Sequence, residues 1–261
     1  MKKGLRISLI AAILLGTVAL LCILARGMDK DWALKTCTGL DVCIVDSVSV
    51  SFIKPSEVKA TLEKEYGVYL GKPLDSLNLK KIENILTGVG VISSAQAYIT
   101  PDGLLHLEIG QREPALLFKA PDASYYADAN GFIFPEHPGF KKPLPQVQGQ
   151  IPLCVPAGFK GYPASESEKI WLENITGLAA ILNSDPKWKG AFPKINVDKN
   201  GEIVLYPVKG KEKFIFGDPC SYKEKLAAIQ KYYTHIAPAK EPGYYGSVNL
   251  KYDGQIICRT K

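Results

Sequence analysis

The longest hydrophobic pattern of the chain is an uncharged run from Ile7 to Ala25. A helix of about nineteen residues is about 28 Å long, which is close to the hydrocarbon thickness of a bilayer. Lys2, Lys3 and Arg6 precede the run, whereas acidic and basic residues nearly balance after it. By the positive-inside rule, this pattern predicts a single-pass anchor at 7–25 in the inner membrane, with residues 1–6 in the cytoplasm and the bulk of the chain outside.

Two alternative targeting signals fit this run less well. A cleaved signal peptide usually has a shorter hydrophobic core and a cleavage site of small residues, and the run shows neither. Cys22 could belong to a lipoprotein signal, but Leu20 and Leu21 are larger than the residues that such signals carry. We therefore interpret residues 7–25 as a retained membrane anchor.

After a linker at 26–41, the spacing of apolar residues predicts one small α+β domain at 42–113. Alternating apolar residues over 42–52 are typical of a half-buried strand, and helical spacing follows over 56–66 and 79–87. Two further strands then flank a turn that contains Pro, Asp and Gly. The predicted order of elements is β-α-α-β-β.

Residues 114–261 predict a second domain that is built on hairpins. The dipeptides Asn130-Gly131 and Asp253-Gly254 favour type I′ turns, because both central positions of such a turn need positive φ. Lys199-Asn200-Gly201 makes a third such turn. Each turn is predicted to join two neighbouring antiparallel strands, so the domain is expected to contain an antiparallel sheet.

Two amphipathic helices are predicted to pack on this sheet. The first begins at a capping box formed by Ser165 and Glu168 and ends before Pro186. The second is capped by Asp218 and stops before Pro238. Their apolar stripes are Trp171, Ile175, Leu178 and Leu182 in the first helix, and Tyr222, Leu226, Ile229 and Tyr233 in the second. Such stripes favour a buried core, and the whole chain is predicted to be an α+β protein.

The composition is that of an ordinary globular protein, with 46% hydrophobic and 22% charged residues among 261. The formal net charge is +6, but three of the 32 basic residues are Lys2, Lys3 and Arg6. The remaining 29 basic residues are set against 26 acidic ones. Such a small excess does not provide a phosphate-binding surface, so we expect no nucleic-acid partner.

Five cysteines follow the predicted anchor, in a compartment where disulfides can form. They are Cys37, Cys43, Cys154, Cys220 and Cys258. Cys37 with Cys43 and Cys220 with Cys258 are plausible pairs, and the odd number leaves at least one cysteine unpaired. Their irregular spacing matches no zinc site, so we interpret them as structural residues or free thiols.

The histidines give no catalytic or metal-binding pattern. His106 alternates with leucines and is expected to face solvent, His137 lies in a proline-rich loop, and His235 ends a helix. The chain also lacks a G-x-S-x-G elbow and a glycine-rich phosphate loop. We therefore predict a non-enzymatic protein with no cofactor, no metal and no small-molecule substrate.

Several segments resemble one bacterial protein family in their order along the chain. Residues 88–114, with the sequence GVGVISSAQAYITPDGLLHLEIGQREP, resemble the end of a polypeptide-transport-associated (POTRA) domain. Within them, Gln111-Arg112-Glu113-Pro114 is similar to the exit motif of the FtsQ/DivIB cell-division family. YYADANGFIFP at 125–135, PLPQVQG at 143–149 and the last helix and hairpin of the chain are similar to that family as well.

This resemblance implies a scaffold at the division septum whose partners are FtsB-like and FtsL-like single-pass proteins. The last strand of the chain would hold the C-terminal part of the FtsB-like partner by strand addition. By position, the residues implied are Tyr252, Gly254, Gln255, Ile256, Ile257, Cys258 and Arg259. The chain departs from the family by carrying Cys258 and Arg259 where an exposed aromatic residue is often found.

Three other interpretations compete with this one. Ile256 and Cys258 could instead complete the core, with the sheet edge covered by the chain itself. The POTRA unit could belong to a secretion or envelope-assembly factor, although such proteins usually carry repeated POTRA units or a barrel. A secreted hydrolase released by signal cleavage is the third alternative, because Ser and Asp are numerous.

Overall fold

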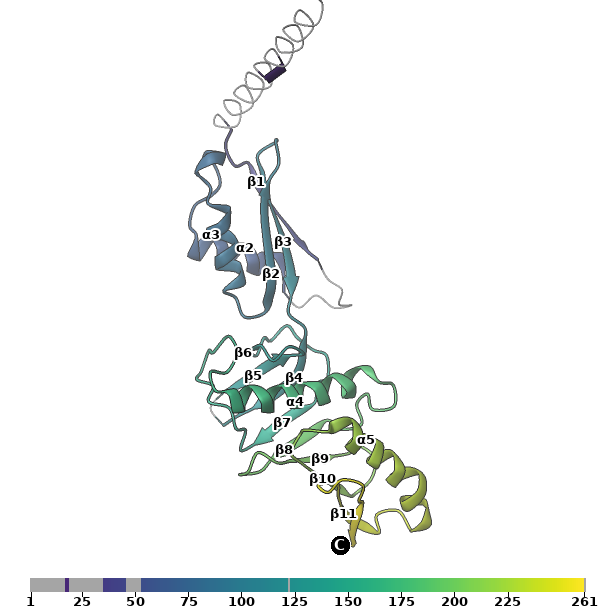
Figure 1. The fold of residues 1–261 in the computed structure, drawn as a ribbon. Coiled ribbons are helices and arrows are strands. Elements are labelled where there is room, and N and C mark those ends of the chain that lie inside the picture. Colours follow the sequence, from purple (N-terminus) through teal and green to yellow (C-terminus); the bar gives the residue numbers. More distant parts are fainter. Residues whose placement is uncertain (1–16, 19–34, 46–52, 122, 261) are drawn as a thin grey trace, which may run out of the picture. The chain divides into compact units, whose positions relative to one another are not determined.

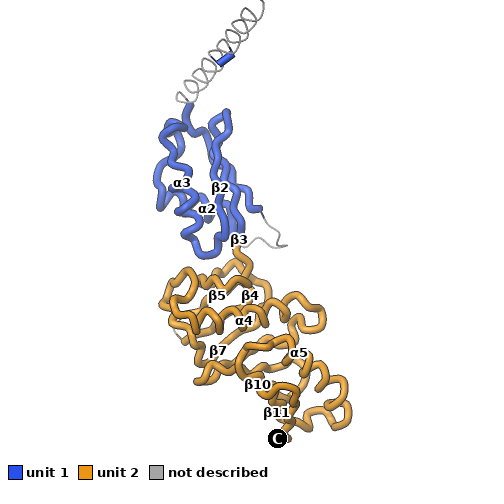
Figure 2. Tube along the Cα trace, in the orientation of Figure 1, with its two compact units in different colours: residues 1–111 blue, residues 112–261 orange. Residues whose placement is uncertain are grey.

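The computed structural model describes residues 17–18, 35–45, 53–121 and 123–260. The predicted anchor at 7–25 lies outside the described residues apart from a helical pair at 17–18, and so does the second half of the strand expected at 42–52. None of the helices described is both long enough and apolar enough to cross a membrane. The chain divides into two compact units, Met1–Gln111 and Arg112–Lys261 (Figure 2).

The first unit is a three-stranded sheet with two helices on one face (Figure 1). Its elements are β1 (Gly39–Ile44), α2 (Pro55–Glu65), the 3-10 turn η1 (Leu74–Ser76), α3 (Leu79–Thr87), β2 (Ile92–Ile99) and β3 (Leu104–Gln111). The strand order is β1-β3-β2, in which β1 runs parallel to β3 and β2 runs antiparallel to it. The β-α-α-β-β order predicted from the sequence is confirmed, and β1 begins within the expected linker at 26–41.

The helices of the first unit begin and end where local chemistry favours it. Pro55 occupies the first position of α2, one residue before the predicted start. Proline is favoured there because the backbone N–H that it lacks would have no partner within the helix. Asn78 caps α3, since its side-chain oxygen accepts a hydrogen bond from the Lys81 backbone N–H at 2.9 Å. Gly67 follows α2 with a φ of 93°, a conformation that favours glycine. The fully buried residues between helices and sheet are Leu62, Ile82, Leu86, Leu105, Leu107 and Ile109.

The second unit is a nine-stranded sheet with two helices packed on one face (Figure 1). Its strands are β4 (Pro114–Lys119), β5 (Ser124–Asp128), β6 (Ile133–Pro135), β7 (Gln146–Gly149), β8 (Lys194–Val197), β9 (Ile203–Tyr206), β10 (Lys213–Gly217), β11 (Tyr245–Asn249) and β12 (Ile257–Thr260). They lie in the order β12-β11-β10-β9-β8-β7-β4-β5-β6. The helices are α4 (Glu166–Ser184) and α5 (Tyr222–Lys231), and α5 continues into a π-helical turn η2 (Tyr232–Ile236) and a 3-10 turn η3 (Ala237–Ala239).

This sheet is mixed, which corrects the expectation of an antiparallel sheet. The pairs β4 with β7, β7 with β8, and β10 with β11 are parallel. The cause lies partly in the connections, because α4 joins β7 to β8 and α5 joins β10 to β11. A helical crossover returns the chain to the start of the next strand, so both strands run in the same direction. Hairpin turns do not reveal this, since they specify only the strands that they join directly.

One apolar core joins the two helices to the sheet. Its members on the helices are Leu172, Ile175, Leu178, Ala179, Leu182, Leu226 and Ile229. In the first stripe Ile175, Leu178 and Leu182 reach the core and Trp171 is partly exposed. In the second stripe Leu226 and Ile229 reach the core, whereas Tyr222 and Tyr233 are partly exposed. Trp171 lies at the margin of the core, where its indole N–H donates to the Gly201 carbonyl at 2.9 Å. Tyr233 is 37% exposed, which the helical spacing did not predict.

The N-termini of α4 and α5 differ from the prediction. Ser165 is the N-cap residue of α4, but its side chain makes no capping bond. The Glu168 carboxylate accepts instead from a backbone N–H of the preceding loop at 3.2 Å, so the expected capping box is wrong. α5 begins after Ser221 rather than at Asp218, because the Asp218 carboxylate accepts from the Cys220 N–H at 2.8 Å and closes a turn before the helix.

The three predicted hairpin turns join neighbouring antiparallel strands as expected, but none of them is a type I′ turn. Asn130, Asn200 and Asp253 have negative φ, and only the glycines that follow them are left-handed. In the first two turns the cause is an aspartate two residues earlier. Asp128 and Asp198 each accept two backbone N–H groups of the loop, which favours a longer loop closed by the glycine.

The five cysteines that the structure describes are all free thiols, so neither disulfide pair considered from the sequence is formed. Cys37 is buried, whereas Cys43 is exposed on β1, and the two side chains therefore lie in different environments. Cys220 is exposed before α5, and Cys258 is partly buried on β12. The interpretation of these residues as free thiols is confirmed.

Candidate functional site

β12 forms one edge of the nine-stranded sheet. Among the described strands it pairs only with β11, in an antiparallel register that places Ile257 opposite Asn249 and Arg259 opposite Ser247. One side of β12 therefore carries backbone groups that no strand of the described chain pairs with. Such an edge is a template for an added strand.

The hydrogen bonds of β11 show which of its backbone groups point toward β12. The Leu250 N–H donates to the Ile215 carbonyl of β10 at 2.9 Å. Backbone groups of successive residues in a strand point to opposite sides, so Val248 also faces β10. The residues that alternate with them, Ser247 and Asn249, therefore face β12.

The same alternation assigns the backbone groups of β12. Ile257 and Arg259 lie opposite the two β11 residues that face β12, so they exchange hydrogen bonds with β11. The N–H and C=O groups of Cys258, which lies between them, therefore point to the open side of the strand. Beyond Arg259 the register shifts and Thr260 pairs with Tyr245, so the alternation is not extended to Thr260. A strand added to this edge would pair with those groups.

The side chains of β12 alternate between the two faces of the sheet. Cys258 and the preceding Ile256 are partly buried and contact the core, whereas Ile257 is 36% exposed and Arg259 is exposed. Burial raises the pKa of the Cys258 thiol, which keeps this side chain uncharged near neutral pH. Ile256 and Cys258 therefore contact the core, as one of the alternative interpretations of the sequence expected. That interpretation also expected a covered sheet edge, but no described strand covers the backbone edge of β12.

A hollow of about 290 Å³ lies between α5 and the turn that precedes β12. Tyr252, Gly254, Gln255 and Ile256 line it from the turn, and acidic and basic side chains both contribute to its walls. Tyr252 is 56% exposed, so its ring is available to a partner. The seven residues implied by the family resemblance thus lie on one continuous segment between this hollow and the edge of the sheet.

No group of His, Cys, Asp and Glu side chains within the described residues could hold a metal ion. His106 does not simply face solvent as expected, because its ring stacks on Tyr98 at 5.1 Å and its Nδ1 lies 3.0 Å from the Asp41 carboxylate. The Nδ1 of His137 accepts from the Gly139 N–H and stabilises a loop. These contacts are structural.

Two family models match the chain. A model described as FtsQ/DivIB, C-terminal related matches residues 113–259, and a model of a POTRA-like domain matches residues 35–110. The chain belongs to the FtsQ/DivIB family. The resemblance noted from the segments around 88–114 and 125–135 is therefore confirmed. No curated protein matches the chain.

Membership of the FtsQ/DivIB family, together with the POTRA-like domain, points to a division-related scaffold, since both families are generally non-enzymatic. The family departure at Cys258 and Arg259 also has a structural meaning. The Cys258 side chain contacts the core, so the change leaves its outward backbone groups in place. The side chains of Ile257 and Arg259 lie on the opposite face of the sheet from Cys258 and are exposed.

Sequence reasoning placed the candidate residues on the last turn and strand, but β12 begins only at Ile257, so Gln255 and Ile256 belong to the turn. It also missed two features. The sequence could not show that the backbone N–H of Cys258 points to the open side of the sheet, because this direction depends on the register between β11 and β12. It also missed the hollow beside α5, for which Ala227 and Ala228 were the available signal. Small side chains on a helix leave space beside it.

Proposed function

We propose that this chain is a non-enzymatic, single-pass membrane scaffold of the bacterial division machinery. It holds FtsB-like and FtsL-like single-pass partners at the septum through a strand added to β12. The observation that supports this proposal is the side of β12 that no described strand pairs with, where the backbone groups of Cys258 point outward. Strand addition draws affinity from such groups and specificity from the neighbouring side chains.

The side chains on the exposed face of β12 contribute to the choice of partner. Ile257 supplies an apolar contact for the neighbouring side chain of an added strand. Arg259 is exposed and favours an acidic residue at the next position on the same face. Residues 252–256 and the adjacent hollow receive the part of the partner that lies beyond the strand.

The membrane anchor belongs to the same proposal. Residues 7–25 hold the chain in the inner membrane, with residues 1–6 in the cytoplasm and both folded units on the other side. A partner anchored in the same membrane meets β12 at a raised effective concentration, so a short strand interface is sufficient. No cofactor and no small molecule takes part.

A matched pair of variants at Cys258 tests this proposal. Cys258→Pro removes the outward N–H, which an edge strand tolerates, whereas Cys258→Ala removes the thiol and keeps the N–H. Co-purification of an FtsB-like protein with the full-length chain should be lost in the first variant and kept in the second. Both variants should remain folded and sediment with membranes.

Equal recovery of the partner with both variants would contradict strand addition at this edge. Removal of the residues after Asp253 is a second check, because it deletes the whole last strand; a partner that still co-purifies must bind elsewhere. Depletion of the chain in its host should block septation. Cells that divide normally without the chain would refute the division role itself.

A further inference from the structure

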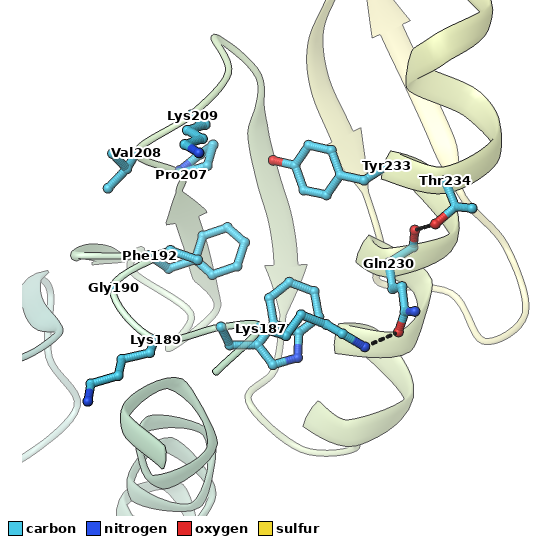
Figure 3. Close-up of a pocket in the computed structure, with 12 residues that line it drawn as sticks. Lys187, Lys189, Gly190, Phe192, Pro207, Val208, Lys209, Gln230, Tyr233 and Thr234 are labelled. Atoms are coloured by element: carbon cyan, nitrogen blue, oxygen red, sulfur yellow. Dashed lines mark hydrogen bonds between the residues drawn. The ribbon is translucent and has the colours of Figure 1, made fainter. Parts of the chain in front are cut away.

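A second surface of the Arg112–Lys261 unit has no part in the proposal above. A cavity of about 530 Å³ lies between the loop after α4, the loop between β9 and β10, and the end of α5 (Figure 3). Its lining within the described chain includes no residue of β12 or of the turn before it. The cavity is therefore distinct from the sheet edge.

The floor of the cavity is aromatic. Trp188 and Phe192 are 8% and 2% exposed, and their rings stack with centroids 6.0 Å apart. The ring of Phe192 also packs edge-on against Phe214, so the floor of the cavity is in contact with the core. Val208 lines the cavity from the loop between β9 and β10 and is 63% exposed. A bulky apolar side chain would remove Val208 and the floor from water.

The rim of the cavity is positively charged. Lys187, Lys189 and Lys209 line it, and no Asp or Glu of the described chain does. The Lys187 ammonium donates to the Gln230 side-chain oxygen at 2.9 Å, so it is held in place without losing its charge. Lys189 and Lys209 form no salt bridge with any residue that the structure describes. Their charges are therefore available to an anionic ligand.

Tyr233 forms a wall of the cavity because α5 ends in the π-helical turn η2. Tyr232 stays buried at 3% exposure, while Tyr233 points across the cavity toward the loop that carries Val208 (Figure 3). Burial and the nearby carboxylate of Glu212 raise the pKa of the Tyr233 hydroxyl, so this hydroxyl stays protonated near neutral pH. π-helical turns are rare and are frequently found at functional sites.

A smaller hollow of about 300 Å³ adjoins the cavity. Lys189, Gly190 and Phe192 line both of them, so the two share one wall. Lys142 adds a further ammonium to the rim of the smaller hollow, although it pairs with the Glu113 carboxylate at 2.7 Å. The two hollows form an apolar track that is bordered by lysines.

We propose that this cavity binds an acidic segment of a partner protein that carries a bulky apolar side chain. That side chain occupies the cavity between Trp188 and Val208, and flanking carboxylates pair with Lys189 and Lys209. Charge complementarity identifies the occupant, because the lining combines three lysines with no carboxylate in the described chain. The proposal goes beyond strand addition, since it requires neither β12 nor its backbone groups.

Binding of a synthetic peptide to the full-length chain tests this site. The probe is a fluorescein-labelled peptide in which Leu-Phe is flanked by glutamates on both sides. One control peptide carries lysines in place of the glutamates, and another carries alanines in place of Leu-Phe. Fluorescence anisotropy should detect binding of the acidic apolar peptide alone, and its affinity should fall as salt is raised.

Variants of the chain locate the bound peptide. Combining Lys189→Glu with Lys209→Glu should weaken binding about tenfold or more, because both attractions become repulsions. Val208→Asp should also weaken it, and the exposure of this residue allows the change without unfolding. Lys199→Glu, at the exposed β8–β9 turn, is the matched control and should bind as the unaltered chain does. Cys258→Pro should bind normally as well.

Each other outcome overturns the proposal. Affinity that is unchanged in both the lysine double variant and Val208→Asp would place the peptide elsewhere, as would loss of binding in Cys258→Pro. Equal affinity for the control peptides would show a surface without the stated preference. If the double variant loses binding to phosphatidylglycerol vesicles but keeps the peptide, the lysines serve a lipid surface instead.

Discussion

The Arg112 guanidinium and the Asp128 carboxylate form a buried ion pair, with Nη1 and Oδ2 2.6 Å apart. Their side chains are only 14% and 7% exposed. The other oxygen of Asp128 accepts two backbone N–H groups of the β5–β6 loop, and the Arg112 guanidinium lies 3.7 Å from the centre of the Phe132 ring. The first residue of the second unit is thus fixed to the β5–β6 hairpin.

Arg112→Met should destabilise the second unit by about 3 kcal/mol, because it leaves the Asp128 carboxylate buried without its cation. Urea unfolding of the full-length chain, followed by tryptophan fluorescence, measures the change. The control is Lys119→Met, which breaks an exposed pair with Glu136 and should cost less than about 1 kcal/mol. Equal losses in the two variants would mean that the Arg112 pair is not shielded from solvent.

Helix caps provide a second prediction, in which the structure and the sequence disagree. Asn78→Ala should destabilise the first unit by about 1 kcal/mol, because the Asn78 side chain accepts the Lys81 N–H. Ser165→Ala should change the second unit by less than about 0.5 kcal/mol, because the Ser165 side chain makes no capping bond. Thermal unfolding measures both. A larger loss of stability in Ser165→Ala would instead support the capping box that the sequence predicts.

Gly149 supports a third prediction, because its backbone approaches β8 closely. It has a φ of 100°, and a Cβ there would clash with the backbone carbonyl oxygen of Val197. Gly149→Ala should therefore destabilise the second unit by more than about 2 kcal/mol. The control is Gly158→Ala, with a φ of 76° and nothing within 4 Å, which should cost about 1 kcal/mol. Indistinguishable unfolding temperatures for the two would argue against the close approach.

The cysteines give a prediction on pH dependence. Burial raises the pKa of Cys258 above the ordinary thiol value of 9.0, so less of the reactive thiolate is present at about pH 8. Iodoacetamide should label Cys258 more slowly than the exposed Cys154, and the rate at Cys258 should keep rising above pH 9.0. Mass spectrometry of proteolytic peptides measures both rates. A rate at Cys258 that matches Cys154 at about pH 8 would contradict the partial burial.

The spacing of apolar residues was sufficient to predict the helices, because a buried stripe depends on residues close in sequence. Leu178 and Leu182 lie one turn apart and both reach the core. Strand direction could not be predicted in the same way. β7 and β8 become parallel neighbours across the whole of α4, and no local pattern in β7 states which strand lies beside it.

The predictions of helix caps and turn types were wrong where another hydrogen bond replaced the expected one. The Glu168 carboxylate accepts from the Cys154 backbone N–H in the loop before α4, so it does not complete the box with Ser165. Asp128 and Asp198 bind their own loops and prevent the two-residue turn that Asn-Gly favours. A local motif therefore predicts the position of a turn better than its type.

The candidate site also combines a feature that the sequence predicted with features that depend on distant segments. Its strand was identified from the sequence and the family resemblance, but the direction of the Cys258 backbone groups depends on pairing between β11 and β12. The lysine-rimmed cavity could not be foreseen at all. It depends on the π-helical turn, which moves Tyr233 out of the stripe that regular helical spacing predicts.

The alternation along β12 restricts the order of residues in any segment that adds to it. Such a segment directs successive side chains to opposite faces of the sheet, one set beside Ile257 and Arg259 and the other beside the helices. Sliding it by a single residue exchanges the two sets. A ligand in which every adjacent pair of residues is transposed would therefore keep its composition and mean hydropathy and still lose recognition.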